Sequence, residues 1–176
     1  MPVAFYLLGE RAKSLSASAK SFGRFRGVID DINCSVLYEN GVSGQFWVSK
    51  SSLGNRNGMK VRIFGSKGSA LWIQNDPEHL ELAYSDGRKE ILDRGSITKE
   101  AKLPRYNRFK AGHPAGYIEA FANLYVDIAK SLRLYMSGKT PDNREITSIE
   151  QEVDRMRFLE TIDISARERK WVDIIY

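Results

Sequence analysis

The sequence contains only one cysteine and two histidines in 176 residues. Cys34 has no partner within the chain for a disulfide, so nothing indicates an oxidising compartment, and we expect a cytoplasmic protein. Cys34, His79 and His113 lie far apart in the sequence, so no metal-ligand spacing occurs and no metal site is predicted. A serine or cysteine nucleophile with a histidine base lacks support for the same reason.

Long apolar runs are also missing. The N-terminal run, residues 3–8, is far too short to span a bilayer. No basic residue precedes it and no small-residue cleavage site follows it, so it is a poor signal peptide. We therefore expect no membrane partner.

Glycine-rich phosphate motifs are absent. A dinucleotide-binding turn needs glycines at the first, third and sixth positions between a strand and a helix, and no such pattern or P-loop occurs here. Two glycine pairs, Gly54 with Gly58 and Gly65 with Gly68, fall between predicted strands, where turn geometry explains them. We expect no cofactor site within this chain.

The composition is that of a folded protein, because 42% of the residues are apolar and 28% are charged. At this length we predict one globular domain over residues 1–176. The net charge of +5 permits attraction to phosphates or anionic substrates. Much of the basic charge lies between Lys99 and Lys110, a segment that contains five basic residues and one acidic residue.

Alternating apolar residues predict strands over much of the first hundred residues. Residues 32–38 and 42–48 alternate around Asn40–Gly41, which is a strong hairpin signal. Further strands are predicted at 59–64, 69–73, 79–84 and 89–92, with turns at 65–68 and 86–87. The serine-rich segment 13–23 is interpreted as a loop or an edge strand, and residues 3–8 as the end of a helix that stops at Gly9.

Helical periodicity dominates the second half. A helix is predicted over residues 114–137, with Pro114 in its first turn and Gly138 at its end. Its apolar face, with Phe121, Tyr125 and Ile128, should pack on the sheet. A capping box at 147–150 predicts a second helix, and residues 171–175 favour a last strand at the sheet edge.

These elements predict an α+β fold, in which two main helices pack on one face of an open, mainly antiparallel sheet. The other face should be available for oligomerisation. Trp47 and Trp72 are expected to project from that open face, and an exposed aromatic face favours a homo-oligomer.

The loop before the long helix is the candidate binding site, with Arg105, Tyr106, Lys110 and His113. Histidine is a common general acid or base, but His113 could equally hydrogen-bond at a sheet–helix corner. The basic residues could bind an anionic or polyhydroxyl ligand, or form a solvated loop. Aromatic residues at this spacing more often pack than touch nucleic acid, so no nucleic-acid partner is expected.

Residues 105–110 and 112–125, with the sequence RYNRFK followed by GHPAGYIEAFANLY, resemble the C-terminal domain of the glucose-fructose oxidoreductase and inositol dehydrogenase family (Gfo/Idh/MocA). Segments 60–72 and 158–172 are similar to that family as well. Complete members are NAD(P)-dependent oxidoreductases of sugars, inositols and polyols with an N-terminal Rossmann domain. The resemblance implies that NAD or NADP would be bound outside this chain.

The resemblance supplies no catalytic residue. The family's Glu-Lys-Pro motif does not occur, and its catalytic Asp and His precede the segment that residues 4–9 resemble. Arg105, Tyr106, Lys110 and His113 match the loop that forms one wall of the family's sugar pocket. The resemblance therefore implies a truncated or isolated C-terminal domain that contributes a substrate pocket wall and an oligomer interface, and is inactive alone. The alternative is a non-catalytic interaction or polyol-binding protein that uses the same sheet as a dimer scaffold.

Overall fold

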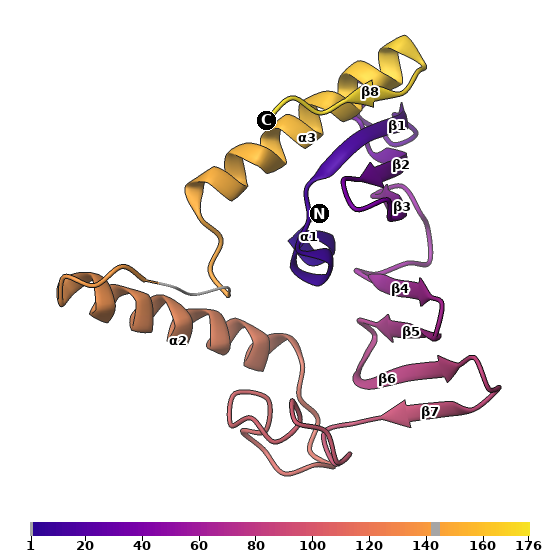
Figure 1. The fold of residues 1–176 in the computed structure, drawn as a ribbon. Coiled ribbons are helices and arrows are strands. Elements are labelled where there is room, and N and C mark those ends of the chain that lie inside the picture. Colours follow the sequence, from indigo (N-terminus) through magenta and orange to yellow (C-terminus); the bar gives the residue numbers. More distant parts are fainter. Residues whose placement is uncertain (1, 142–144) are drawn as a thin grey trace. The chain divides into compact units, whose positions relative to one another are not determined.

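The computed structural model describes residues 2–141 and 145–176 (Figure 1). The chain divides into two compact units, Met1–Gly54 with Thr147–Tyr176, and Asn55–Ile146. Each unit contains one four-stranded antiparallel sheet, so the α+β class and the open antiparallel architecture are confirmed. The strands form two hydrogen-bonded sheets where we expected one. The extent of a single domain over 1–176 stays a prediction.

The first unit is a sheet covered by a helix. Its elements are α1 (Pro2–Leu8), β1 (Ala12–Lys20), β2 (Asp31–Tyr38), β3 (Ser43–Ser49), α3 (Ile149–Glu168) and β8 (Val172–Asp173). The strand order is β3-β2-β1-β8, and α3 packs along β1 and β8 (Figure 1). Alternation places Leu15, Cys34 and Val36 on the face that meets Phe158 and Ile162 of α3. These five side chains are buried and form most of the core.

β1 differs from the sequence prediction of a loop or an edge strand. It pairs with β2 along its whole length and with β8 on its other side, so it is an internal strand. Its inward residues include Leu15 and Ala17, whereas its outward residues include Ser16 and Ser18. Alanine and serine differ little in hydropathy, and this weak contrast hid the period of two.

Trp47 projects from the face opposite the core, as predicted. It stands opposite Asn33, and its indole N–H donates a 3.0 Å hydrogen bond to Asp31 Oδ2. The side chain is 63% exposed. The neighbouring outward residues Ser35 and Gln45 are polar, so the face is less apolar than we expected.

The lone cysteine is a core residue. Burial raises the pKa of the Cys34 thiol to about 11, so the group stays protonated at neutral pH. A protonated, inaccessible thiol is a poor nucleophile, and Cys34 therefore serves packing.

The second unit contains a meander of four strands. β4 (Lys60–Gly65), β5 (Gly68–Ile73), β6 (Asp76–Tyr84) and β7 (Lys89–Leu92) pair in that order. The predicted turns at 65–68 and 86–87 are confirmed, and Gly87 adopts a φ of +89°. Gly68 has a further requirement, since a Cβ there would lie 2.3 Å from the Ala83 carbonyl oxygen. Only glycine lets β5 approach β6 this closely at that position.

The long helix α2 (Tyr117–Met136) begins three residues later than predicted. Gly116 is its N-cap, and the Gly116 N–H donates a 2.7 Å hydrogen bond to Glu119 Oε2. This bond is the main reason that the pKa of Glu119 lies below its ordinary value. Pro114 therefore precedes the first turn instead of lying in it.

The expected burial of the α2 apolar face is not observed. Phe121, Tyr125 and Ile128 are 45%, 62% and 37% exposed. The buried residue of α2 is Asp127, which is 4% exposed. A carboxylate buried on this helix indicates a charged partner, because an unpaired buried charge is costly.

The remaining predicted ends are close to those observed. α3 begins with a capping box of Ser148 and Gln151, one residue later than the predicted pair at 147 and 150. β8 is an edge strand, as predicted. In the ranges 2–141 and 145–176, no helix combines the length and apolar character needed to cross a membrane.

Candidate functional site

A pocket of about 680 Å³ lies within the Asn55–Ile146 unit. Its walls come from the loop before β4, from β5 and the start of β6, from the loop that follows β7, and from the first turns of α2. The lining includes aromatic and basic residues together with an amide: Arg56, Trp72, Arg94, Arg105, Tyr106, Arg108, Phe109, Tyr117 and Asn123. Its volume is in the range of pockets that hold small organic ligands.

A pair of charged residues fastens the loop to the sheet. Arg94 Nε lies 2.6 Å from Glu78 Oε2 on β6, and both side chains are mostly buried. The same guanidinium donates to the carbonyl oxygens of Phe109, at 3.1 Å, and His113. The other Glu78 oxygen accepts from the Ala115 N–H at 3.0 Å. This clamp fixes the path of the loop that carries the basic residues.

Arg105 is held by two carboxylates. Its Nη2 lies 2.9 Å from Asp127 Oδ2 and 3.5 Å from Glu145 Oε2. The guanidinium also lies over the Tyr106 ring, 5.2 Å from its centroid. Burial opposes the charge, but Tyr106, Glu145 and Asp127 outweigh burial and raise the pKa of Arg105 above its ordinary value. Arg105 is therefore a permanent cation that explains the buried Asp127.

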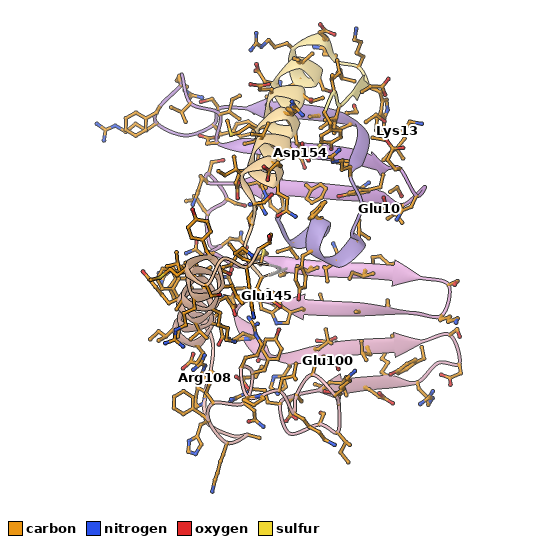
Figure 2. The ribbon with its side chains drawn as sticks, turned by 60° about the vertical axis from the view of Figure 1, so that its left-hand side comes forward. Glu10, Lys13, Glu100, Arg108, Glu145 and Asp154 are labelled. Carbon is orange, nitrogen blue, oxygen red and sulfur yellow. The ribbon has the colours of Figure 1, made fainter. Side chains whose placement is uncertain are left out.

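Arg108 is held by a neutral amide. Asn123 Oδ1 on α2 accepts from Arg108 Nε at 3.1 Å and from Arg108 Nη2 at 2.7 Å. The Asn123 amide nitrogen donates to the Arg105 carbonyl at 3.0 Å. Arg108 lies beside α2 in Figure 2. The amide thus sets the orientation of the guanidinium without cancelling its charge.

The four residues predicted for the site do not share one position. Arg105 and Tyr106 line the pocket. Lys110 and His113 are exposed and are not among the lining residues, and the His113 N–H donates to the Lys110 carbonyl at 3.1 Å. A substrate contact by any of the four stays a prediction.

Sequence reasoning missed several lining residues. Glu78, Arg94 and Asn123 come from three separate elements, and no local pattern connects them. Trp72 was expected on the open sheet face, but it is half-buried in the pocket wall, where its indole N–H donates to the Pro77 carbonyl at 3.1 Å. The alternation of residues along β5 predicts which side chains share a face, but it does not predict which face forms the pocket wall.

The lining combines aromatic rings with amides and guanidinium groups. Trp72, Tyr106, Phe109 and Tyr117 supply the rings. Asn57, Gln74, Asn75 and Asn123 supply amides that can both donate and accept hydrogen bonds. Rings pack against apolar ligand faces, and amides and guanidinium groups bind hydroxyl or acidic groups. Such a pocket suits a polyhydroxyl compound.

The described residues do not fit a nicotinamide dinucleotide. Every strand pair within residues 2–141 and 145–176 is antiparallel, so this part of the chain has no βαβ unit of the kind that holds a pyrophosphate. The same ranges contain no cluster of three metal-ligating His, Cys, Asp or Glu side chains. We therefore derive no hydride-transfer step from these residues.

Comparison with known proteins shows that the chain is similar to one part of several oxidoreductases. Residues 2–71 match the model of the GFO/IDH/MocA C-terminal domain. The uncharacterized oxidoreductase YfiI of Bacillus subtilis (strain 168) is 29% identical over 172 residues, which are 93% of this chain and 42% of YfiI.

Two solved structures are similar over almost the whole chain. An oxidoreductase from Sinorhizobium meliloti shares 26% identity with a TM-score of 0.85, over 97% of this chain and 49% of that one. An inositol dehydrogenase homolog from Azotobacter vinelandii, in complex with NADH and myo-inositol, shares 30% identity with a TM-score of 0.82, over 95% and 45%. The chain spans less than half the length of each of these relatives.

Proposed function

We propose that this chain, which corresponds to the C-terminal domain of the GFO/IDH/MocA family, forms the substrate side of an NAD(P)-dependent oxidoreductase of sugars or polyols. In this proposal the 680 Å³ pocket of the Asn55–Ile146 unit holds the sugar or polyol. The chain supplies binding and orientation. The nicotinamide cofactor, which accepts or donates the hydride, is held by residues outside the chain.

The observation behind the proposal is the pocket lining itself. Trp72 and Tyr106 offer ring faces, and Asn123 and Arg105 are fixed by hydrogen bonds and ion pairs before any ligand arrives. Preorganised donors lower the entropic cost of binding a hydroxyl-rich ligand. The 30% identical inositol dehydrogenase homolog, crystallised with NADH and myo-inositol, supports the same class of substrate.

Binding of polyols to the 176-residue chain tests this proposal. Calorimetric titration with myo-inositol and with a panel of hexoses should give saturable binding to one site. Replacing Trp72 with Leu should raise the Kd about tenfold, because the largest ring in the wall is lost. Trp47→Leu is the matched control, since Trp47 lies outside the pocket, and it should leave the Kd unchanged.

A titration with NADH completes the test. We expect no binding of the dinucleotide to this chain. Failure of every sugar and polyol to bind, or equal weakening by Trp72→Leu and Trp47→Leu, would contradict the proposal.

We also propose that a second copy of the chain is a partner. Trp47, at 63% exposed, is an amphipathic ring that Asp31 holds on the outward face of the β3-β2-β1-β8 sheet. Aromatic residues of this kind are enriched in interfaces. A non-catalytic interaction protein would use the same face. The exposed Trp47 therefore favours an interaction protein as the second candidate function.

A further inference from the structure

We propose that the ligand of the pocket is a sugar or polyol that carries an acidic group, a carboxylate or a phosphate monoester, and that Arg108 binds this group. The inference rests on the proposed function and narrows its substrate class. It comes from the way the charges that line the pocket are compensated.

Two of the four arginines in the lining are already neutralised. Arg94 pairs with Glu78 at 2.6 Å, and it also donates hydrogen bonds to two loop carbonyls. Arg105 pairs with Asp127 at 2.9 Å and lies 3.5 Å from Glu145. Both guanidinium groups have a structural partner, so neither requires a ligand.

The other two arginines have no acidic partner. Among residues 2–141 and 145–176, neither Arg56 nor Arg108 forms an ion pair. Both line the pocket. The one acidic side chain left in the lining, Glu119, accepts the Gly116 N–H of its own helix cap and stays ionised, because this bond lowers its pKa. Arg56 and Arg108 together with Glu119 therefore leave one net positive charge in the lining.

Arg108 is exposed, but its guanidinium is held in one orientation. Asn123 Oδ1 accepts from its Nε and Nη2 at 3.1 and 2.7 Å, and the Asn123 nitrogen is fixed in turn by the Arg105 carbonyl. A neutral acceptor holds the guanidinium plane and leaves the Nη1 donors for another group. Planar guanidinium donors match the oxygens of carboxylates and phosphates.

The pocket provides for the rest of such a ligand as well. Tyr106 and Phe109, which flank Arg108 in the loop, and Tyr117 of α2 line the same cavity. The amides of Asn57 and Gln74 line the same cavity. An acidic sugar would place its anion at Arg108 and its hydroxyl groups among the amides and rings.

Isothermal titration of the full 176-residue chain tests the inference. The ligands are myo-inositol and glucose as neutral probes, glucuronate as the carboxylate, glucose 6-phosphate as the phosphate ester, and inorganic phosphate alone. We expect at least one acidic sugar to bind at least tenfold more tightly than glucose, with affinity that falls as salt is added. The tighter of the two acidic sugars identifies the acidic group.

Variants locate the effect. Arg108→Gln should weaken binding of the acidic sugar tenfold to a hundredfold, the loss expected for a charge-assisted hydrogen bond, and should therefore lower the ratio of acidic-sugar affinity to glucose affinity. Asn123→Asp places a carboxylate against Arg108 and removes the donor to the Arg105 carbonyl, so it should lower the same ratio. Arg133→Gln removes the same charge from an exposed site of α2 that is outside the pocket, and it should have no effect.

The outcomes are distinguishable from failure of the proposed function. Equal affinity for glucose and both acidic sugars, or acidic-sugar affinity that is unchanged in Arg108→Gln and in Asn123→Asp, overturns the inference but leaves a neutral-polyol site intact. Inorganic phosphate that binds as tightly as glucose 6-phosphate also overturns it, because the sugar then contributes nothing. Loss of all sugar binding refutes the proposed function itself.

Discussion

Ser165 shows how much of the first unit depends on one hydroxyl group. The side chain is fully buried near the end of α3. Its oxygen accepts the Ala17 N–H of β1 at 2.9 Å, and its proton is donated to the Lys170 carbonyl at 2.6 Å. The hydroxyl therefore links the helix, the central strand and the segment that leads to β8.

Ser165→Ala should lower the free energy of unfolding by about 1–3 kcal/mol, because a partly buried N–H and a partly buried carbonyl lose the buried hydroxyl that is their partner. Urea unfolding followed by circular dichroism measures the change. Ser66→Ala is the control, since Ser66 lies exposed in the β4–β5 turn. A loss no greater than that of the control would show that water replaces the hydroxyl.

Residue-level prediction worked where the conformation is local. Gly9 and Gly41 adopt φ values of +67° and +82°, as a helix stop and a hairpin turn require. Ser165 was not singled out, because its partner Ala17 lies 148 positions away in the sequence. A contact between residues far apart in the sequence cannot be recognised from a short sequence segment.

At the scale of elements, the loop between β7 and α2 is positioned by strand β6. Arg94 and Glu78 together bind the backbone at Phe109, His113 and Ala115. Their side chains are 13% and 24% exposed, so water screens the pair only partly. The position of this pocket wall therefore depends on the ion pair between Arg94 and Glu78.

Arg94→Gln should destabilise the second unit by about 2–3 kcal/mol, because Glu78 is left without its cation and two carbonyls lose a donor. Hydrogen exchange of the amides in residues 105–116 should accelerate, and mass spectrometry of peptic peptides from the labelled full chain detects this. Arg88→Gln is the matched control, because the Arg88–Asp86 pair is exposed and contributes little. Unchanged exchange in Arg94→Gln would assign the fixing of the loop to other contacts.

Element prediction succeeded where two signals agreed. Strands β2 to β7 combine alternation with turn residues, and all were predicted within three residues of their observed bounds. β1 lacked the contrast, and the start of α2 was placed at Pro114 because the cap formed by Gly116 and Glu119 has no polar cap side chain at its first position. The exposed Phe121 face of α2 shows that a helical apolar stripe predicts an amphipathic element without telling what covers it.

At the scale of the whole molecule, the pocket depends on chain segments that the sequence does not connect. Residues between Arg56 and Asn123 meet around one cavity, and they come from two strands, the loops beside them and the helix α2. The basic run from Arg105 to Lys110 pointed to the right region, but only half of the predicted residues line the cavity. A run of like charge locates a loop, whereas the tertiary fold decides which of its side chains turn inward.

The proposed self-association is also a property of the whole molecule. Light scattering at micromolar concentration should give a mass of at least two chains, and Trp47→Asp should reduce it to one, because a charge on the sheet face cannot be buried unpaired. Phe25→Asp alters an equally exposed ring outside the sheet and should leave the mass unchanged. A wild-type chain that is monomeric throughout would remove the second copy as a partner.

The group that orients Arg108 is the Asn123 side-chain amide, which has no ionisable proton. A pH dependence of acidic-sugar binding at this contact would therefore report the ionisation of the ligand. A phosphate ester, whose second ionisation occurs at about pH 6, would show a step there, whereas a sugar carboxylate would show a plateau.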